Sequence, residues 1–105
     1  MTHTVVVGAG FGGIATALRS RAMGHSVTLL DRLDQLGGRA QVFEKEGFRH
    51  DAGPTVITAP FLFDELFELF GKRLEDYAQI VPLDTWYDFY FSDKQTFSYR
   101  GDMSH

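Results

Sequence analysis

The sequence TVVVGAGFGG at residues 4–13 decides the fold of this chain. Its first four residues form a β-branched run, which favours a buried strand of a parallel sheet. The run leads into the glycine pattern G-x-G-x-x-G at Gly8, Gly10 and Gly13. Between a strand and a helix, these glycines permit a tight turn, a close backbone approach to a pyrophosphate and close packing of helix on strand, in that order.

The residues that follow supply the context that this pattern needs. Residues 12–23 carry apolar side chains at helical spacing, and Gly24 is a natural stop for that helix. Residues 26–31 read as a second strand. A strand, a helix and a strand in such a short stretch form a βαβ unit, whose crossover should be right-handed.

Asp31 stands where the second strand is expected to end. It lies 18 residues after Gly13, close to the spacing of about 20 that is typical of an acidic ribose ligand. Its carboxylate can accept hydrogen bonds from the hydroxyls of an adenosine ribose and would repel a 2′-phosphate, which disfavours NADP. A plain turn between strand and helix is the alternative. The flanking elements and the acidic residue together favour dinucleotide binding.

A second glycine pair, Gly37 and Gly38, lies in the loop after Asp31 and is followed by Arg39. The pair lets the backbone pass close to a bound phosphate or ribityl chain, and Arg39 offers a charged planar fork suited to phosphate. The alternative is a solvated loop arginine, the usual state of an isolated arginine. Because the loop should lie at the carboxyl edge of the sheet, where ligands bind in such folds, we favour a binding role.

The remaining sequence predicts smaller elements. We expect short strands at 41–43 and 47–50 around a turn, an irregular segment at 51–58, a helix at 61–70 after Pro60, and an antiparallel pair at 86–91 and 96–99. The predicted fold class is α/β, a partial Rossmann-like domain built on one βαβ unit. It has small antiparallel additions, one extra helix and an incomplete sheet, since only two parallel strands are evident.

Composition excludes several classes of function. A net charge of −4 without a basic run argues against a nucleic-acid partner. The absence of cysteine excludes a disulfide scaffold and thiolate metal sites, and we expect no metal. No stretch approaches the roughly 20 apolar residues of a membrane span, and no basic signal region is present, so we expect a cytoplasmic protein.

The motifs together carry a family resemblance. Residues 5–13, Asp31 and the Gly37–Gly38–Arg39 loop resemble the FAD-binding flavoproteins of the amine-oxidase and carotenoid-desaturase group. Residues 48–58, FRHDAGPTVIT, look like the segment typical of bacterial phytoene desaturases, and the similarity extends from Thr4 to about Tyr99. The resemblance implies that residues 1–105 are a single, truncated N-terminal part of an FAD-binding domain.

The resemblance also implies roles for individual residues. The pyrophosphate would lie against the first glycine loop, the ribose against the acidic residue, the phosphates along the second loop, and the flavin ring beside the GPTV segment. In the same order, the residues implied are Gly8, Gly10, Gly12 and Gly13; Asp31; Gly38 and Arg39; and Gly53, Pro54, Thr55 and Val56. A structural turn is the alternative for Gly53 and Pro54. We interpret His50 as a packed structural histidine and assign no catalytic residue.

The function implied is FAD-dependent desaturation, which introduces C=C bonds into a lipophilic carotenoid precursor such as phytoene. The whole enzyme would associate peripherally with the inner membrane face, whereas this chain alone would be inactive. The alternatives are another flavoenzyme of the amine-oxidase superfamily and a non-catalytic FAD-binding remnant; an NAD-binding module is more distant. For the helix at 61–70 we favour core packing over a lipid-facing surface, because its acidic residues do not suit an anionic bilayer.

Overall fold

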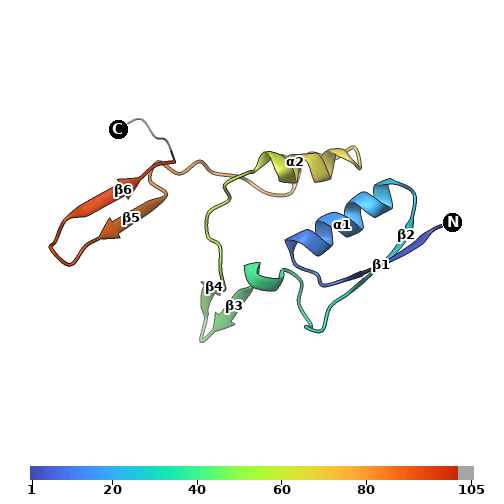
Figure 1. Cartoon of the computed structure of the whole chain (residues 1–105), viewed down its shortest axis with the longest axis horizontal. Coiled ribbons are helices and arrows are strands. Elements are labelled where there is room, and N and C mark those ends of the chain that lie inside the picture. The colour runs from blue at the N-terminus through green and yellow to red at the C-terminus, as the bar shows by residue number, and fades with distance from the viewer. Residues whose placement is uncertain (102–105) are drawn as a thin grey trace.

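The first structured unit is a pair of parallel strands joined by a helix. In the computed structural model, which describes residues 1–101, β1 (His3–Val7) leads into α1 (Phe11–Ala22), and α1 leads into β2 (Ser26–Leu30) (Figure 1). All five residues of β1 pair in parallel with the five of β2. The predicted βαβ unit is confirmed, and its helix begins and ends one residue earlier than the sequence indicated.

Glycines set both ends of α1. At its start, Gly8 has a left-handed φ of +105°, and its amide donates to the Leu30 carbonyl at 2.7 Å, so the chain leaves β1 in a tight turn. At its end, the amide of Gly24 (φ +91°) donates to the Arg21 carbonyl at 3.0 Å. The next amide donates to the carbonyl before Arg21 at 3.1 Å. This pair of bonds is a Schellman motif, so Gly24 ends the helix as predicted.

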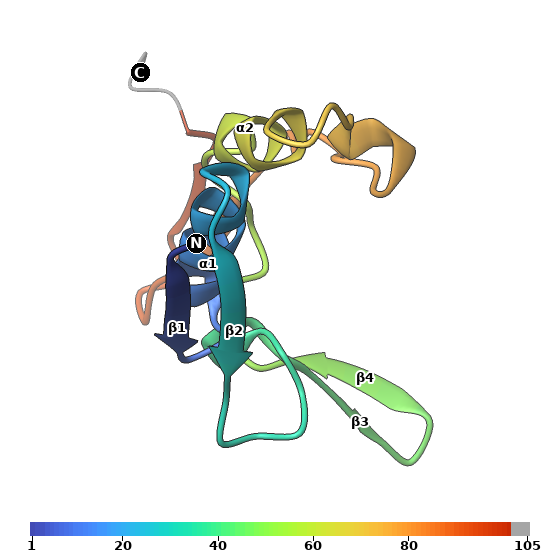
Figure 2. The same ribbon diagram turned by 90° about the vertical axis from the view of Figure 1, so that its right-hand side faces the viewer.

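The β1–β2 sheet is covered on one face only. The Val6 side chain lies next to Gly13 of α1 and is 8% exposed, whereas Val5 and Val7 are 53% and 82% exposed. Figure 2 shows α1 behind the two strands and the opposite face free of other described segments. The predicted burial of this strand is therefore found at Val6 but not at Val5 or Val7, because alternate side chains of β1 lack a covering layer among the described residues.

A hairpin follows the glycine-rich loop. β3 (Val42–Lys45) pairs antiparallel with β4 (Phe48–Asp51), and the turn residues Glu46 and Gly47 have φ of +53° and +82°. Two positive φ angles match a type I′ turn, which suits the twist of a hairpin. Both strands therefore begin one residue later than predicted. Every residue of β4 is exposed, so the prediction of a packed His50 is wrong.

The second helix, α2 (Phe61–Glu68), lies beside α1 (Figure 1). The rings of Phe11 and Phe63 meet edge-on with centroids 5.4 Å apart, and Arg19 forms a 3.0 Å ion pair with Glu65. An apolar cavity of about 300 Å³ lies between the helices. Its lining includes Leu18 of α1, Leu66 and Phe67 of α2, and Phe70, which follows α2. The packing predicted for residues 61–70 is thus present on one side of α2, although the helix ends two residues early.

The last described element is a hairpin of β5 (Tyr87–Tyr90) and β6 (Thr96–Tyr99), and a 3₁₀ turn at Leu74–Asp76 precedes it. The hairpin extends away from the βαβ unit (Figure 1), and the three two-stranded sheets do not join. The radius of gyration is 18.0 Å, against about 13 Å for a compact domain of 100 residues. Within residues 1–101, no helix is long and apolar enough to cross a membrane.

Candidate functional site

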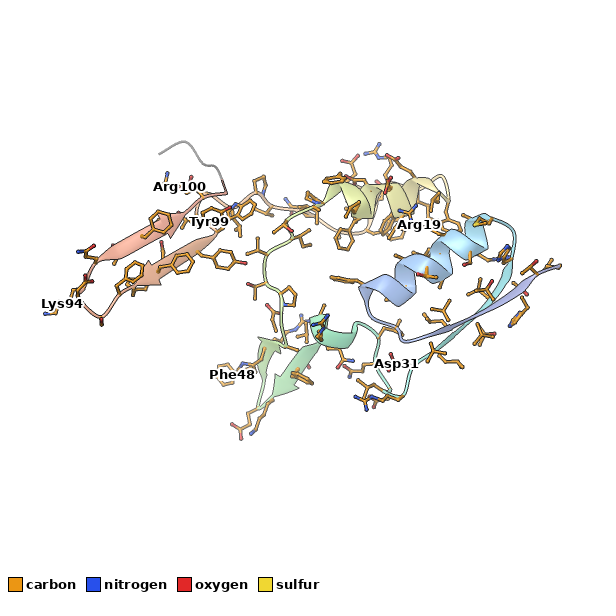
Figure 3. All side chains as sticks on the ribbon, in the orientation of Figure 1. Arg19, Asp31, Phe48, Lys94, Tyr99 and Arg100 are labelled. Carbon is orange, nitrogen blue, oxygen red and sulfur yellow. The ribbon has the colours of Figure 1, made fainter. Side chains whose placement is uncertain are left out.

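Asp31 ties the end of β2 to the loop that leaves β1. Its Oδ2 accepts a hydrogen bond from the Ala9 amide at 2.7 Å, and its Oδ1 accepts one from the Leu33 amide at 2.8 Å. Figure 3 shows Asp31 at the carboxyl end of β2, near the loop that leads into α1. The Ala9 bond, followed by the Leu33 bond, lowers the pKa of Asp31, because both donors stabilise the charged form.

The two glycine-rich loops lie side by side. The Gly37 amide donates to the Ala9 carbonyl at 2.8 Å, and Gly10 and Gly37 form a parallel bridge. A Cβ on Gly38 would lie 3.1 Å from the Gly10 Cα, which is closer than ordinary packing allows. The absence of a side chain at Gly38 therefore permits the approach, and the structure places the two predicted loops at one edge of the sheet.

The glycines of the first loop differ in what they touch. A Cβ on Gly13 would collide with the Gly8 carbonyl oxygen, so Gly13 permits the close packing of helix on strand that its spacing predicts. A Cβ on Gly12 would meet nothing within 4 Å. Gly12 thus borders open space at the start of α1. The approach of Gly10 to a pyrophosphate stays a prediction.

The N-terminal end of α1 is suited to an anion. Gly10 occupies the cap position, no side chain caps the helix, and the first turn holds no acidic residue. The first amides of an α-helix have no acceptor within the helix, and they carry a partial positive charge. The open space at Gly12 leaves room for a phosphate against these amides. The donors and the free volume therefore fit the phosphates of a dinucleotide.

Arg39 lies in a 3₁₀ turn, Gly38–Ala40, that the sequence did not predict. Its side chain is exposed, and among the described residues it forms no ion pair, so its charge is available to a ligand. A Cβ on Gly53 would collide with the Arg39 carbonyl oxygen, and the Ala52 amide donates to the Gln41 carbonyl at 2.9 Å. The structure thus brings the start of the GPTV segment to the Arg39 turn.

The rest of the GPTV segment is irregular. Pro54 and Thr55 are exposed, and Val56 is half-buried. Their position beside a flavin ring stays a prediction.

Sequence spacing did not predict the second role of Asp31, which is to support both loops. An Asx turn, in which the side chain bonds the amide two residues on, is the local signal that could have indicated its bond to Leu33.

The comparison with protein families agrees with this geometry. The model for the NAD(P)-binding Rossmann-like domain matches residues 6–73, which include β1, α1, β2 and both glycine-rich loops. The chain belongs to this Rossmann-like family. The α/β fold class predicted from the sequence is confirmed, and membership supports a dinucleotide as the ligand at the carboxyl ends of β1 and β2.

This Rossmann-like chain is similar to several bacterial carotenoid enzymes. It is 46% identical over 104 residues to phytoene desaturase (lycopene-forming) of Pantoea ananas, an alignment that covers 99% of this chain and 21% of that protein. It is 46% identical over 99 residues to 4,4′-diapophytoene desaturase (4,4′-diaponeurosporene-forming) of Staphylococcus haemolyticus (94% and 20%). It is 37% identical over 94 residues to 4,4′-diaponeurosporene oxygenase of Staphylococcus aureus (90% and 19%).

The chain therefore spans about a fifth of the length of the curated relatives it matches. The resemblance to bacterial phytoene desaturases is confirmed across nearly the whole chain. The relatives named as desaturases share more identical residues with it than the relatives named as oxygenases do.

Proposed function

We propose that this chain is the FAD-binding part of an oxidoreductase that introduces C=C bonds into a carotenoid precursor. One observation carries the proposal: Asp31, Gly37 and the first glycine loop are hydrogen-bonded into one cluster at the carboxyl ends of β1 and β2. The 46% identity to a phytoene desaturase and to a diapophytoene desaturase supports the choice of reaction.

The adenosine diphosphate half of FAD suits this cluster. The pyrophosphate would accept hydrogen bonds from the amides at the start of α1, and Arg39 would add a charged donor. Asp31 would accept from the ribose hydroxyls, since each carboxylate oxygen has a second lone pair beyond the one its backbone donor uses. Pro54, Thr55 and Val56 would lie toward the flavin ring.

Three features favour FAD over a nicotinamide cofactor. The Gly37–Gly38–Arg39 loop lies against the first glycine loop, Arg39 forms no ion pair within residues 1–101, and the alignment with the related desaturases covers this stretch of chain. When bound, FAD supplies a hydride acceptor for the oxidation of a C–C single bond to a double bond. The chain's own residues bind and orient it. We assign none of them as a catalytic acid or base and expect the chain alone to be inactive.

The substrate and location follow from the same proposal. The relatives are named for phytoene, diapophytoene and diaponeurosporene, so we infer a lipophilic carotenoid substrate. A substrate of this kind partitions into membranes, and peripheral association with the cytoplasmic membrane face would bring the enzyme to it.

A chimera tests this function directly. The aligned region of the Pantoea ananas phytoene desaturase is replaced by this chain, and the purified product is examined for bound flavin and for conversion of phytoene. We expect a yellow protein that forms lycopene. A control chimera with Asp31→Ala and Arg39→Ala should lose the flavin. A folded chimera that holds no flavin would contradict FAD binding, and a flavin-loaded one that leaves phytoene unchanged would contradict the desaturase assignment.

A further inference from the structure

Gly53 is not a glycine that the backbone needs for a left-handed φ. Its φ lies outside the left-handed region that favours glycine, in contrast to Gly37 and Gly38, whose φ angles are +112° and +57°. A left-handed φ therefore does not explain the glycine at position 53. The reason for glycine must lie in the space around the residue.

The space at Gly53 is closed by the backbone of Arg39. A Cβ at position 53 would collide with the Arg39 carbonyl oxygen and would lie 3.5 Å from its carbonyl carbon. The obstacle is a peptide group, which cannot rotate aside as a side chain can. The neighbouring Ala52 amide holds the segment in place through its 2.9 Å bond to the Gln41 carbonyl. Residues 52 and 53 are thus fixed against the turn that carries Arg39.

On its other side, the Arg39 turn (Gly38–Ala40) contacts the first glycine-rich loop through Gly38. The Cα of Gly10 lies 3.1 Å from the place where a Gly38 Cβ would be, and the turn is closed internally by the Ala40 amide, which donates to the Gly37 carbonyl at 3.0 Å. The turn is therefore packed between the cap residue of α1 and Gly53. The position of the Arg39 guanidinium relative to the start of α1 depends on both contacts.

We propose that Gly53 is a positioning residue for Arg39 and acts on the phosphate end of the dinucleotide rather than on the flavin ring. The inference rests on the proposed function, since it concerns the binding of FAD. If residue 53 carried a side chain, the Arg39 turn would have to move, and the guanidinium would move with it relative to a phosphate bound at the start of α1. A direct contact of Gly53 with the flavin ring would leave the phosphate end unaffected.

A double-mutant cycle separates these roles. The affinities of the full chain for ADP, which lacks the flavin, and for FAD are measured by calorimetry for the wild type, Gly53→Ala, Arg39→Ala and the double variant. We expect Gly53→Ala to weaken ADP and FAD equally, by about tenfold, the loss of one charge-assisted hydrogen bond. In the Arg39→Ala background the same substitution should cost less than about twofold, because its target is already gone. Thr58→Ala, an exposed change in the same loop, is the control.

Hydrogen exchange supplies a readout that needs no cofactor. In Gly53→Ala, the Ala52 amide should exchange faster than in the wild type, whereas the Gly8 amide, which bonds to Leu30, should keep its rate. Faster exchange at both amides would indicate general unfolding of that variant. Ala52→Pro then replaces it, because it removes the bond to Gln41 without adding a Cβ at position 53, and it should show the same coupling to Arg39.

The outcomes are distinct. Equal losses with and without Arg39, or a loss for FAD but not for ADP, would overturn the inference while leaving FAD binding intact. A wild-type chain that binds neither ADP nor FAD would overturn the proposed function. In that case unchanged exchange at Ala52 in the Gly53→Ala variant would overturn the positioning role, and faster exchange confined to Ala52 would support it.

Discussion

The Ala9 amide donates a 2.7 Å hydrogen bond to Oδ2 of Asp31, across the gap between the ends of β1 and β2. Ala9 is fully buried, so its amide depends on this carboxylate for a hydrogen-bond partner. The residue expected to hold a ribose thus also holds the loop in which the phosphates would lie. Ligand binding and loop structure depend on one side chain.

Asp31→Asn should therefore weaken both properties. An asparagine presents one oxygen in place of two, so its NH₂ group faces one of the two backbone donors, from Ala9 or Leu33. We expect a lower Tm and at least a tenfold weaker affinity for FAD. Thermal unfolding and flavin fluorescence titration measure the two effects. An unchanged Tm would show that the carboxylate does not support the loop.

The same carboxylate predicts a pH dependence of stability. The hydrogen bonds from Ala9 and Leu33 lower the pKa of folded Asp31 from its ordinary value of 3.8. A lowered folded-state pKa contributes stability that is fully present above the unfolded-state pKa and is lost as the pH falls through the folded-state pKa. The urea midpoint of the wild type should exceed that of Asp31→Asn near about pH 6, and the gap should narrow toward about pH 3. A gap independent of pH would contradict this origin.

The glycine pattern predicted the βαβ unit because the glycines that shape this unit act on residues close to them in the sequence. Gly8 turns the chain, Gly13 packs against the Gly8 carbonyl and Gly24 ends the helix, all within one short stretch. The contact of Gly53 with Arg39 joins residues far apart in the sequence and leaves no periodic signal. The one-sided burial of β1 was also missed, because a valine run looks the same whether one or both of its faces are covered.

The β3–β4 turn shows a different limit. Glu46 adopts a positive φ that its residue type does not favour, because Gly47 and the twist of the strands impose a type I′ turn. Residue preferences alone placed the turn earlier, and the strand bounds shifted with it. Likewise, alternation along β4 suggested that His50 is packed, but both strands of this hairpin are exposed throughout the described structure.

Gly13→Ala and Gly12→Ala form a matched pair in the first turn of α1. The Cβ of the first collides with the Gly8 carbonyl oxygen, whereas that of the second meets nothing within 4 Å. We expect Gly13→Ala to destabilise the chain by about 1–3 kcal/mol through overpacking, and Gly12→Ala to stabilise it by up to about 1 kcal/mol through helix propensity. Urea unfolding followed by circular dichroism measures both. Equal stabilities would contradict the close packing at Gly13.

Arg39 should bind phosphate through its planar fork and not through charge alone. Arg39→Lys keeps the charge but loses the bidentate geometry, so we expect it to recover only part of the FAD affinity that Arg39→Ala loses, about tenfold. Titrations at low and high salt should show the steepest salt dependence for the wild type and the shallowest for Arg39→Ala. If all three proteins share one affinity and one salt dependence, Arg39 does not contact the phosphates.

The most direct test of the central claim is a titration of the ¹⁵N-labelled chain with FAD, followed by the amide resonances. FAD bound between the two glycine-rich loops should shift the amides of residues 10–13 and 37–39 in a saturable way and leave those of β5 and β6 in place. Shifts confined to other segments, or no saturable shift at any concentration, would contradict the assignment of this cluster as an FAD site.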